Sequence, residues 1–285
     1  MLKPKVRQEA ASWVVERFGL SQRRAGSLVS VSRTVFTYTP RENELNDSLR
    51  NRIKELAGKY RRYGHWRLYV ILRREGFRVN HKRTERIYRS ERLSLRIRKK
   101  KKLASMARVA TPEVVHANQI WAMDFVSDSL WTGRKFRSLT LVDTYTKESL
   151  AIEVDTSLSG QRVVRVLERL SEINGLPEFI RVDNGPEFIS KALDEWAYRN
   201  QVKLDFIRPG KPTENAYIES FNGKFRDECL NENYFSDLTE AREVIERWRV
   251  EYNTYRPHSS LNDLTPEVFR KSKESLTQNH QELYL

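Results

Sequence analysis

Three acidic residues stand out because their types and positions could hold divalent metal ions. Asp124 lies mid-way in an alternating apolar run, Asp183 lies at the end of another apolar run, and Glu219 follows 36 positions later. An ionisable side chain on the apolar face of a strand is costly to bury, and a bound cation would offset that cost. Carboxylate oxygens suit Mg²⁺, and paired Mg²⁺ ions catalyse chemistry at phosphodiesters. These residues predict a two-metal site.

Each of these acids also has a plainer interpretation. Asp183 precedes Asn184 and Gly185, so it could serve only as a turn former. Glu219 could be an ordinary solvated carboxylate on a helix. An acid pair at a fixed separation also arises by chance in a chain with 38 acidic residues. The shared context of the three residues favours one site over three coincidences.

Other polar residues are weaker candidates for the site. Asp143 and Asp128 could be residues of a hairpin or a strand end. Glu187 could help to position a metal or substrate, or could simply be favourable in the first turn of its helix. Lys211, beside Pro209 and Gly210 in a basic loop, could hold DNA phosphates, but an ordinary solvated loop is an equal alternative.

The elements that must position these acids follow one another in a recognisable order. Alternating apolar positions predict strands and apolar spacings of three and four predict helices. The expected order is three strands, helix, strand, helix, strand, which is typical of a ribonuclease-H-like mixed sheet with helices on both faces. The expected elements are strands at 119–126, 136–146 and 148–154, a helix at 160–173, a strand at 179–185, a helix at 187–200 and a strand at 202–207.

A further helix is expected to carry Glu219. Ile218, Phe221, Phe225 and Cys229 fall at helical spacing and form an inward-facing stripe. Glu219, Asn222 and Arg226 form the neighbouring stripe, which could face the two aspartates. In a sheet of this order the middle of the first strand and the end of the fourth strand lie side by side, so the three acids can converge.

The charge of the chain is concentrated in its first part. Residues 1–110 hold 30 Lys and Arg against 9 Asp and Glu, whereas residues 111–285 hold 22 against 29, so a segment of +21 and a segment of −7 make up the net +14. A localised excess of this size indicates a polyanionic partner, most commonly nucleic acid. A basic face that is merely solvated is the alternative.

The basic segment reads as small helical units. A helix at 5–18, a second helix capped by Ser21 and a short third segment have helix-turn-helix spacing, although three-helix packing without a DNA role is also open. A second helical group is expected at 43–58, 65–75 and 81–92. Its Tyr60, Tyr63 and Trp66 fit a small core better than stacking on bases.

The DNA-binding candidates come from these units, the basic run that follows them and the later basic loop. We expect double-stranded DNA to be held through its phosphates. The candidate residues are Arg23, Arg24, Arg33, Arg61, Arg62, Arg67, Lys82, Arg83, Arg86, Lys99, Lys100, Lys101, Lys102 and Lys211.

Composition excludes several protein classes. Charged residues make up 32% and hydrophobic residues 39% of the chain, which supports a packed core and excludes collagen-like or wholly disordered chains. The single cysteine, Cys229, excludes an internal disulfide and a cysteine-based zinc site. No apolar run is long enough to span a membrane and no secretory signal opens the chain, so we expect a soluble, cytoplasmic protein with no membrane partner.

Several motifs of this chain resemble one known family. The segments WAMDFV, RVDNGPEF and KPTENAYIESFNGKFRDECL resemble the three catalytic blocks of DDE transposases and retroviral-type integrases. The closest resemblance is to the catalytic OrfB chain of IS-three-type bacterial insertion sequences. YRRYGHWRLYVILRREGFRVNHKRTERIYR looks like the second helix-turn-helix-like segment of that group, and YNTYRPHSSLNDLTPEVF is similar to its C-terminal signature.

The resemblance implies a multidomain fold and a defined activity. The implied fold joins N-terminal all-α helix-turn-helix-like modules to an α/β ribonuclease-H-like core with a mixed five-stranded sheet and a helical C-terminal tail. The implied divisions are modules at 1–40 and 41–95, a basic linker at 96–115, the catalytic core at 116–230 and the extension at 231–285. Asp124, Asp183 and Glu219 would be the catalytic, metal-binding triad for two Mg²⁺ ions, with Mn²⁺ as a substitute.

The activity implied is DNA cleavage and strand transfer at transposon ends, that is, transposition, integration and recombination without a covalent enzyme intermediate. The implied partners are transposon-end and target DNA, further copies of the chain as a homo-oligomer on DNA, and an OrfA partner or frameshift fusion. The implied location is the bacterial nucleoid. The chain lacks a sustained leucine-zipper heptad and the zinc-binding module of integrases. A related DDE recombinase or a DNA-binding regulator, for instance an inactive domesticated transposase, are the alternatives.

Overall fold

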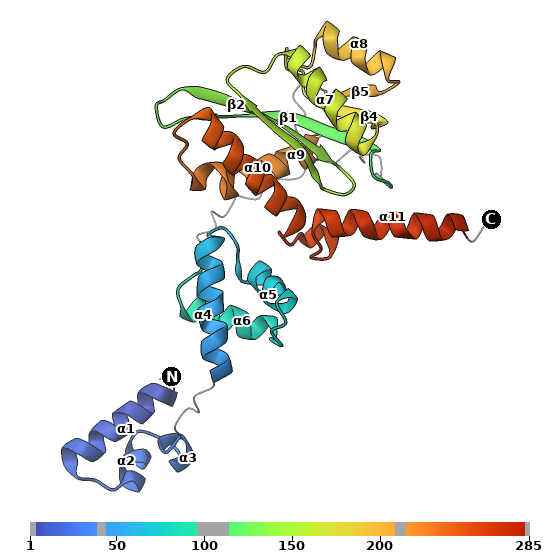
Figure 1. Cartoon of the computed structure of the whole chain (residues 1–285). Coiled ribbons are helices and arrows are strands. Elements are labelled where there is room, and N and C mark those ends of the chain that lie inside the picture. Colours follow the sequence, from blue (N-terminus) through green and yellow to red (C-terminus); the bar gives the residue numbers. More distant parts are fainter. Residues whose placement is uncertain (1–3, 39–43, 96–113, 209–214, 283–285) are drawn as a thin grey trace. The chain divides into compact units, whose positions relative to one another are not determined.

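The computed structural model describes residues 4–38, 44–95, 114–208 and 215–282 (Figure 1). It divides into two compact units, Met1–Asn51 and Arg52–Leu285. Among the described residues no helix is both long and apolar enough to cross a membrane. Lys99 to Lys102 and Lys211, all expected to contact DNA, lie outside the described ranges.

The first unit contains the three helices expected near the N-terminus, α1 Pro4–Phe18, α2 Gln22–Leu28 and α3 Arg33–Phe36. Ser21 caps α2 by accepting a hydrogen bond from the Arg24 main-chain N–H. Gly26 is required where α2 meets the next turn, because a Cβ there would lie 2.9 Å from the Val31 carbonyl oxygen. The last helix has only four residues, so it offers less than the full recognition helix of a helix-turn-helix unit.

The second helical group also matches its expected ranges. It comprises α4 Glu44–Lys59, which crosses the boundary between the units, followed by α5 His65–Arg74 and α6 His81–Ser90. Asn80 caps α6 by accepting from the Lys82 main-chain N–H at 3.0 Å. Leu68 and Leu72 of α5 are buried, as is Ile87 of α6, so the apolar stripes of these helices face inward.

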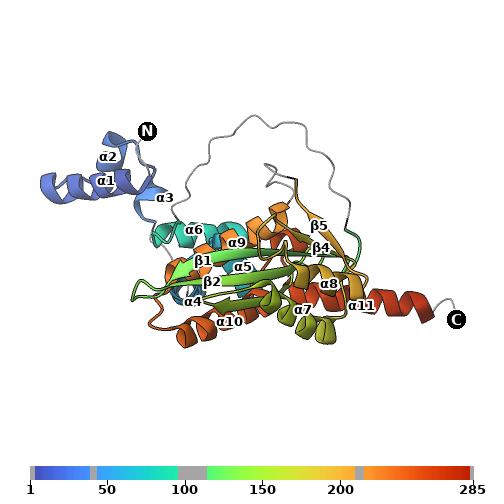
Figure 2. The ribbon, with the colours of Figure 1, turned by 90° about the horizontal axis from the view of Figure 1, so that it is seen from above.

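A five-stranded mixed sheet forms the centre of the second unit. The strands are β1 Ile120–Ser129, β2 Lys135–Asp143, β3 Ser149–Asp155, β4 Phe179–Val182 and β5 Lys203–Phe206, in the spatial order β3-β2-β1-β4-β5. The strands β1 and β2 form a long antiparallel hairpin that β3 extends, while β4 and β5 are parallel to β1 (Figure 2). The expected ribonuclease-H-like strand order is confirmed.

Helices cover both faces of this sheet. Trp121 and Met123 belong to a buried cluster with α7 Gly160–Asn174 and α8 Lys191–Arg199. Ala122 and Val126 belong to the opposite cluster, with α9 Ala216–Glu228 and α10 Leu238–Thr254. Since neighbouring strand residues point to opposite faces, Asp124 lies on the α9 face.

The helix expected at 187–200 begins later than its range. It is α8, which starts at Lys191 with Ser190 as its N-cap, because the Ser190 hydroxyl accepts from the Leu193 N–H at 3.3 Å. Pro186 suggests an earlier start, but the capping serine sets the boundary. Glu187 therefore precedes the helix and is not a first-turn carboxylate.

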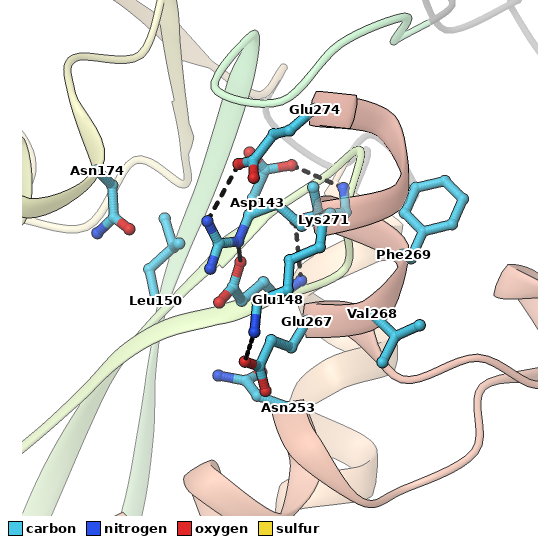
Figure 3. Close-up of polar contacts among 12 residues, drawn as sticks. Asp143, Glu148, Leu150, Asn174, Asn253, Glu267, Val268, Phe269, Lys271 and Glu274 are labelled. Carbon is cyan, nitrogen blue, oxygen red and sulfur yellow. Dashed lines mark hydrogen bonds and ion pairs between the residues drawn. The ribbon is translucent and has the colours of Figure 1, made fainter. Parts of the chain in front are cut away.

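The C-terminal helix α11 Pro266–Glu282 is anchored to the turn between β2 and β3 (Figure 3). Its Arg270 lies 3.0 Å from Glu148 and 3.1 Å from Glu274, and the Phe269 ring contacts Tyr145. Burial raises the pKa of the Glu148 carboxyl, while the nearby Arg270 charge acts in the opposite direction. The tail thus packs on the central sheet through a partly buried ion pair.

Candidate active site

The parallel pairing of β1 and β4 brings Asp124 and Asp183 together. Ala122 pairs with Arg181 in the register of these strands, and the same register two residues further on places Asp124 beside Asp183. Asp183 follows the last residue of β4, where its Oδ1 accepts a hydrogen bond from the Gly185 N–H at 2.9 Å. A Cβ at Gly185 would lie 2.9 Å from that same oxygen, so the turn that orients Asp183 needs glycine.

The packing of α9 against the sheet determines where Glu219 lies. Ile218, Phe221 and Phe225 are almost completely buried on the sheet side of α9, as their spacing predicts. Glu219 and Asn222 lie one position later on the same helix, in the stripe next to the sheet. The amide Nδ2 of Asn222 donates to Asp124 Oδ2 at 2.8 Å, which fixes this stripe beside β1.

Asp124 lies in an environment that disfavours its ionised form. Burial is the largest effect on Asp124 and raises the pKa of its carboxyl, and the charges of Asp183 and Glu219 raise it further. Hydrogen bonds from the Phe125 N–H and from Asn222 act in the opposite direction by stabilising the ionised form. A half-buried carboxylate held next to two more is destabilised as an anion, and a cation would relieve that strain.

A polar pair orients Asp124 from the α9 side. Thr140, directly opposite Asp124 on β2, is buried, and its hydroxyl lies 2.9 Å from Asn222 Oδ1 and 3.0 Å from the Asp124 carbonyl oxygen. The helical spacing predicted the stripe that carries Asn222, whereas Thr140 was not among the predicted site residues. The feature of the sequence that could have indicated Thr140 is a hydroxyl residue within the apolar run of β2.

Within the described ranges, no three or more His, Cys, Asp and Glu side chains are arranged so that they could hold a metal ion. Asp124 uses both carboxylate oxygens in hydrogen bonds, Oδ1 with the Phe125 N–H and Oδ2 with Asn222. The donors of the triad are nevertheless hard carboxylate oxygens, which is the ligand type that Mg²⁺ and Mn²⁺ take. The chemistry of the donor set fits such an ion, although the side chains do not enclose one.

The weaker candidates have structural roles. Asp143 is the buried last residue of β2, at the hairpin expected for it, and its carboxylate accepts from the main-chain N–H groups of Asn118, Tyr145 and Thr146 at 2.6, 2.7 and 2.9 Å. Glu187 forms an ion pair with Arg137, whose guanidinium lies 4.2 Å from the centre of the Phe125 ring. The paired Arg137 lowers the pKa of the Glu187 carboxyl against the effect of burial.

The candidate DNA-binding residues fall into two groups. The first group is exposed on helices: Arg23 and Arg24 on α2, Arg33 on α3, and Lys82 and Arg86 on α6, with the half-buried Arg83 beside them. The second group faces acidic side chains of the same unit: Arg61 lies 4.0 Å from Glu232, Arg62 3.2 Å from Asp227 and Arg67 3.0 Å from Glu228.

The aromatic residues of the second helical group only partly match the expected small core. Tyr60 and Tyr63 are buried, and their rings stack with a centroid separation of 4.7 Å. Trp66 is 43% exposed, so its expected place in the core is wrong. Its indole N–H instead donates to Asp263 at 2.9 Å, and this partner is too distant in sequence to be inferred from the pattern.

Family models match three parts of the chain. Two models described as integrase core domains match residues 115–212 and 200–266, and a model described as an HTH-like domain matches residues 44–101. The first two matches contain Asp124, Asp183 and Glu219. The third covers the second helical group.

Two curated relatives are similar over most of their length. A 31.7 kDa protein of insertion element IS407 from Burkholderia multivorans is 48% identical over 258 residues, which is 90% of this chain and 93% of the relative. A putative transposase, InsK of insertion sequence element IS150 from Escherichia coli, is 25% identical over 78% of this chain and 82% of its own length.

Among solved structures, a chain of the simian T-cell lymphotropic virus intasome in complex with PP2A regulatory subunit B56 gamma is similar in fold. The TM-score is 0.52 at 18% sequence identity, with 76% of this chain and 73% of that chain covered. At this identity the likeness concerns the fold alone, and it agrees with the strand order of the central sheet.

Proposed function

This chain belongs to the DDE transposases of bacterial insertion sequences, in the IS-three-type group with an OrfB catalytic chain, and we propose that it cleaves and joins DNA strands at insertion-sequence ends. The family makes it a polynucleotidyl transferase with an integrase-type core. The proposal adds the residues, the metal ions and the DNA sites through which this particular chain acts.

Asp124, Asp183 and Glu219 are the proposed catalytic residues. They come from β1, from the end of β4 and from the first turn of α9, and the charges of the other two act on the carboxyl of Asp124. The parallel pairing of β1 with β4 and the hydrogen bond from Asn222 of α9 to Asp124 bring the three elements together, and this is the observation that carries the proposal. Asn222 and Thr140 would hold Asp124 in orientation.

The three carboxylates would hold two Mg²⁺ ions, with Mn²⁺ as a substitute. Bound there, the ions would supply activation of the attacking water or 3′-hydroxyl and stabilisation of the leaving oxygen. The protein's own part is to supply the ligand carboxylates, to fix Asp124 through Asn222, and to keep water from the buried flank of the site with the apolar residues of β1 and α9.

The basic helical units are proposed to bind double-stranded DNA at transposon ends and targets. Arg23, Arg24, Lys82 and Arg86 are exposed, as phosphate contacts require. Assembly as a homo-oligomer on DNA, and cooperation with an OrfA partner or a fusion to it, complete the proposal. A location at the bacterial nucleoid follows from this DNA-binding role.

The direct test replaces one carboxylate of the triad without changing its shape. In Asp183→Asn we expect nicking and strand transfer on a duplex carrying the element's terminal repeats to be lost, with binding to that duplex nearly unchanged. Asp194→Asn is the matched control, because Asp194 is an exposed acid in the first turn of α8.

Strand transfer that persists in Asp183→Asn would refute the assignment of the triad. A chain that binds DNA but shows no metal-dependent cleavage, with or without the substitution, would instead support the alternative of a DNA-binding regulator.

A further inference from the structure

The helix-turn-helix-like module, defined here as residues 52–95, contacts the catalytic part of its own unit through α5. Arg74 donates to the carbonyl oxygens of Tyr255 and Asp263 at 2.8 and 2.5 Å, and the Trp66 indole N–H donates to the Asp263 carboxylate. These contacts join segments that are more than 180 positions apart in the chain. The two contacts of Arg74 have main-chain acceptors, whereas the contact of Trp66 has a side-chain acceptor.

A buried ionic cluster lies at the centre of this contact. Glu228, the last residue of α9, pairs with Arg256 through two hydrogen bonds of 2.7 Å, and Arg67 of the module adds a third at 3.0 Å. The side chains of Arg256 and Glu228 are only 2% and 8% exposed. Carboxylate–guanidinium pairs of this fork geometry combine charge with a fixed orientation.

Aromatic and ionic contacts surround the cluster. The ring of Tyr60 stacks on Tyr255 with a centroid separation of 5.3 Å. On the module side Lys59, Arg61 and Arg62 face Glu251, Glu232 and Asp227 of the catalytic part. Exposed pairs of this kind each contribute little to stability, but a basic side that meets an acidic side specifies how two surfaces pair.

The helix α6 of the module carries further basic residues. Lys82 and Arg86 on α6 are exposed, and no ion pair joins either side chain to another residue that the structure describes. In helix-turn-helix units the last helix is the one that enters the major groove. The module therefore has one basic surface occupied by protein acids and one available to phosphates.

We infer that the acidic surface formed by Asp227, Glu228, Glu232, Glu251 and Asp263 is the docking site of the module, so that α5 and the preceding turn hold the catalytic part and α6 meets DNA. This inference rests on the proposed function for its DNA partner. It assigns Arg61, Arg62 and Arg67 to docking and not to DNA. It also gives the module a set place relative to the catalytic carboxylates.

The part of the inference that concerns docking is tested on the full chain by fluorescence resonance energy transfer between two labelled cysteines. Ser90→Cys on α6 and Tyr198→Cys on α8 place the labels on exposed positions, while the buried Cys229 stays unlabelled because burial raises the pKa of its thiol to about 12. We expect one narrow distance distribution, which broadens when Trp66→Ala and Arg74→Ala are added. A broad distribution in the chain without these two changes would overturn the docking.

The part of the inference that concerns DNA is tested by comparing two pairs of substitutions that remove equal charge. Lys82→Gln with Arg86→Gln should weaken binding to a short mixed-sequence duplex roughly 60-fold near 0.1 M salt, since each lost phosphate contact contributes about 0.9 to the logarithmic salt slope. Arg61→Gln with Arg62→Gln should change that affinity by less than about twofold. An equal or larger loss from the second pair would overturn the assignment of surfaces.

DNA is then added to the labelled chain. We expect the narrow distance distribution to persist, because α6 binds without releasing α5. Broadening on addition of the duplex would mean that phosphates displace the acids from α5, which also overturns the inference. Docking is read without metal or cleavage, so its failure is distinct from a failure of the proposed function, which appears as absence of strand cleavage.

Discussion

Glu228→Gln is expected to destabilise the second unit strongly although it changes few atoms. The substitution keeps the shape of the side chain and removes the carboxylate that pairs with Arg256 in the described part of the chain, where the Arg256 side chain is 2% exposed. Removing one partner of a buried ion pair costs about 3 to 5 kcal/mol, because the other charge stays buried without compensation.

The expected magnitude lies at the lower end of that range. Arg67 is 30% exposed and can regain water, so its share is discounted. Glutamine also keeps one acceptor oxygen for Arg256. We therefore expect a loss of about 3 kcal/mol in the free energy of unfolding.

Urea unfolding measures this change through tryptophan fluorescence, since Trp121 and Trp196 are buried in the catalytic core. With a slope of about 3 kcal/mol per M for a chain of this size, the midpoint should fall by about 1 M urea. Glu195→Gln is the matched control, because Glu195 is 59% exposed and its pair with Lys191 spans 3.6 Å. If Glu228→Gln shifted the midpoint no more than this control does, the cluster would not be desolvated and the reasoning would fail.

Two further predictions concern pH and the catalytic strand. Burial, followed by the charge of Arg256, lowers the pKa of His258 to about 2, so the folded protein holds this imidazole in its neutral form. The stability that His258 contributes is therefore complete above the pKa of about 6.5 that it has in the unfolded chain. Between pH 7 and pH 5 this residue should cost the folded state about 2 kcal/mol, so His258→Asn should show a flatter pH dependence in urea unfolding, and an unchanged slope would contradict it. Asn222→Ala should lower metal-dependent cleavage by roughly 10- to 100-fold and raise the Mg²⁺ concentration required, because it releases Asp124. The exposed Asn231→Ala is its control, and equal Mg²⁺ requirements in the two variants would show that Asn222 does not position Asp124.

Local pattern was sufficient to predict the sheet and the stripes of α9. Strand alternation gave the strand order, and helical spacing correctly placed Ile218 and Phe221 inside, with Asn222 on the stripe next to Asp124. These features depend on neighbours within a few residues, and periodicity reports such neighbours directly. The start of α8 was missed because Pro186 and the capping Ser190 give competing signals for the same boundary.

Contacts between distant segments could not be predicted in the same way. Nothing near Arg67 in the sequence indicates that it meets Glu228, 161 positions later. An arginine in a basic segment looks the same whether its partner is a phosphate or a carboxylate, since both accept the same fork of hydrogen bonds. Net charge therefore identified a segment suited to DNA, but could not distinguish the arginines that face protein acids from those that face solvent.

Long-range contacts also explain the structural role of the C-terminal signature segment, residues 252–269. The amide of Asn253 both accepts from the Ser149 N–H and donates to the Ser149 carbonyl, as a neighbouring strand would, and so fastens the end of α10 to β3. This attachment holds Arg256 against Glu228 at the end of α9, while Glu219 lies in the first turn of the same helix. At 1.5 Å per residue the two glutamates are separated by about 13 Å along the helix axis. The helix α9 thus carries the proposed catalytic carboxylate near one end and the proposed docking carboxylate at the other, so on these proposals the same element would position both the module and the active site.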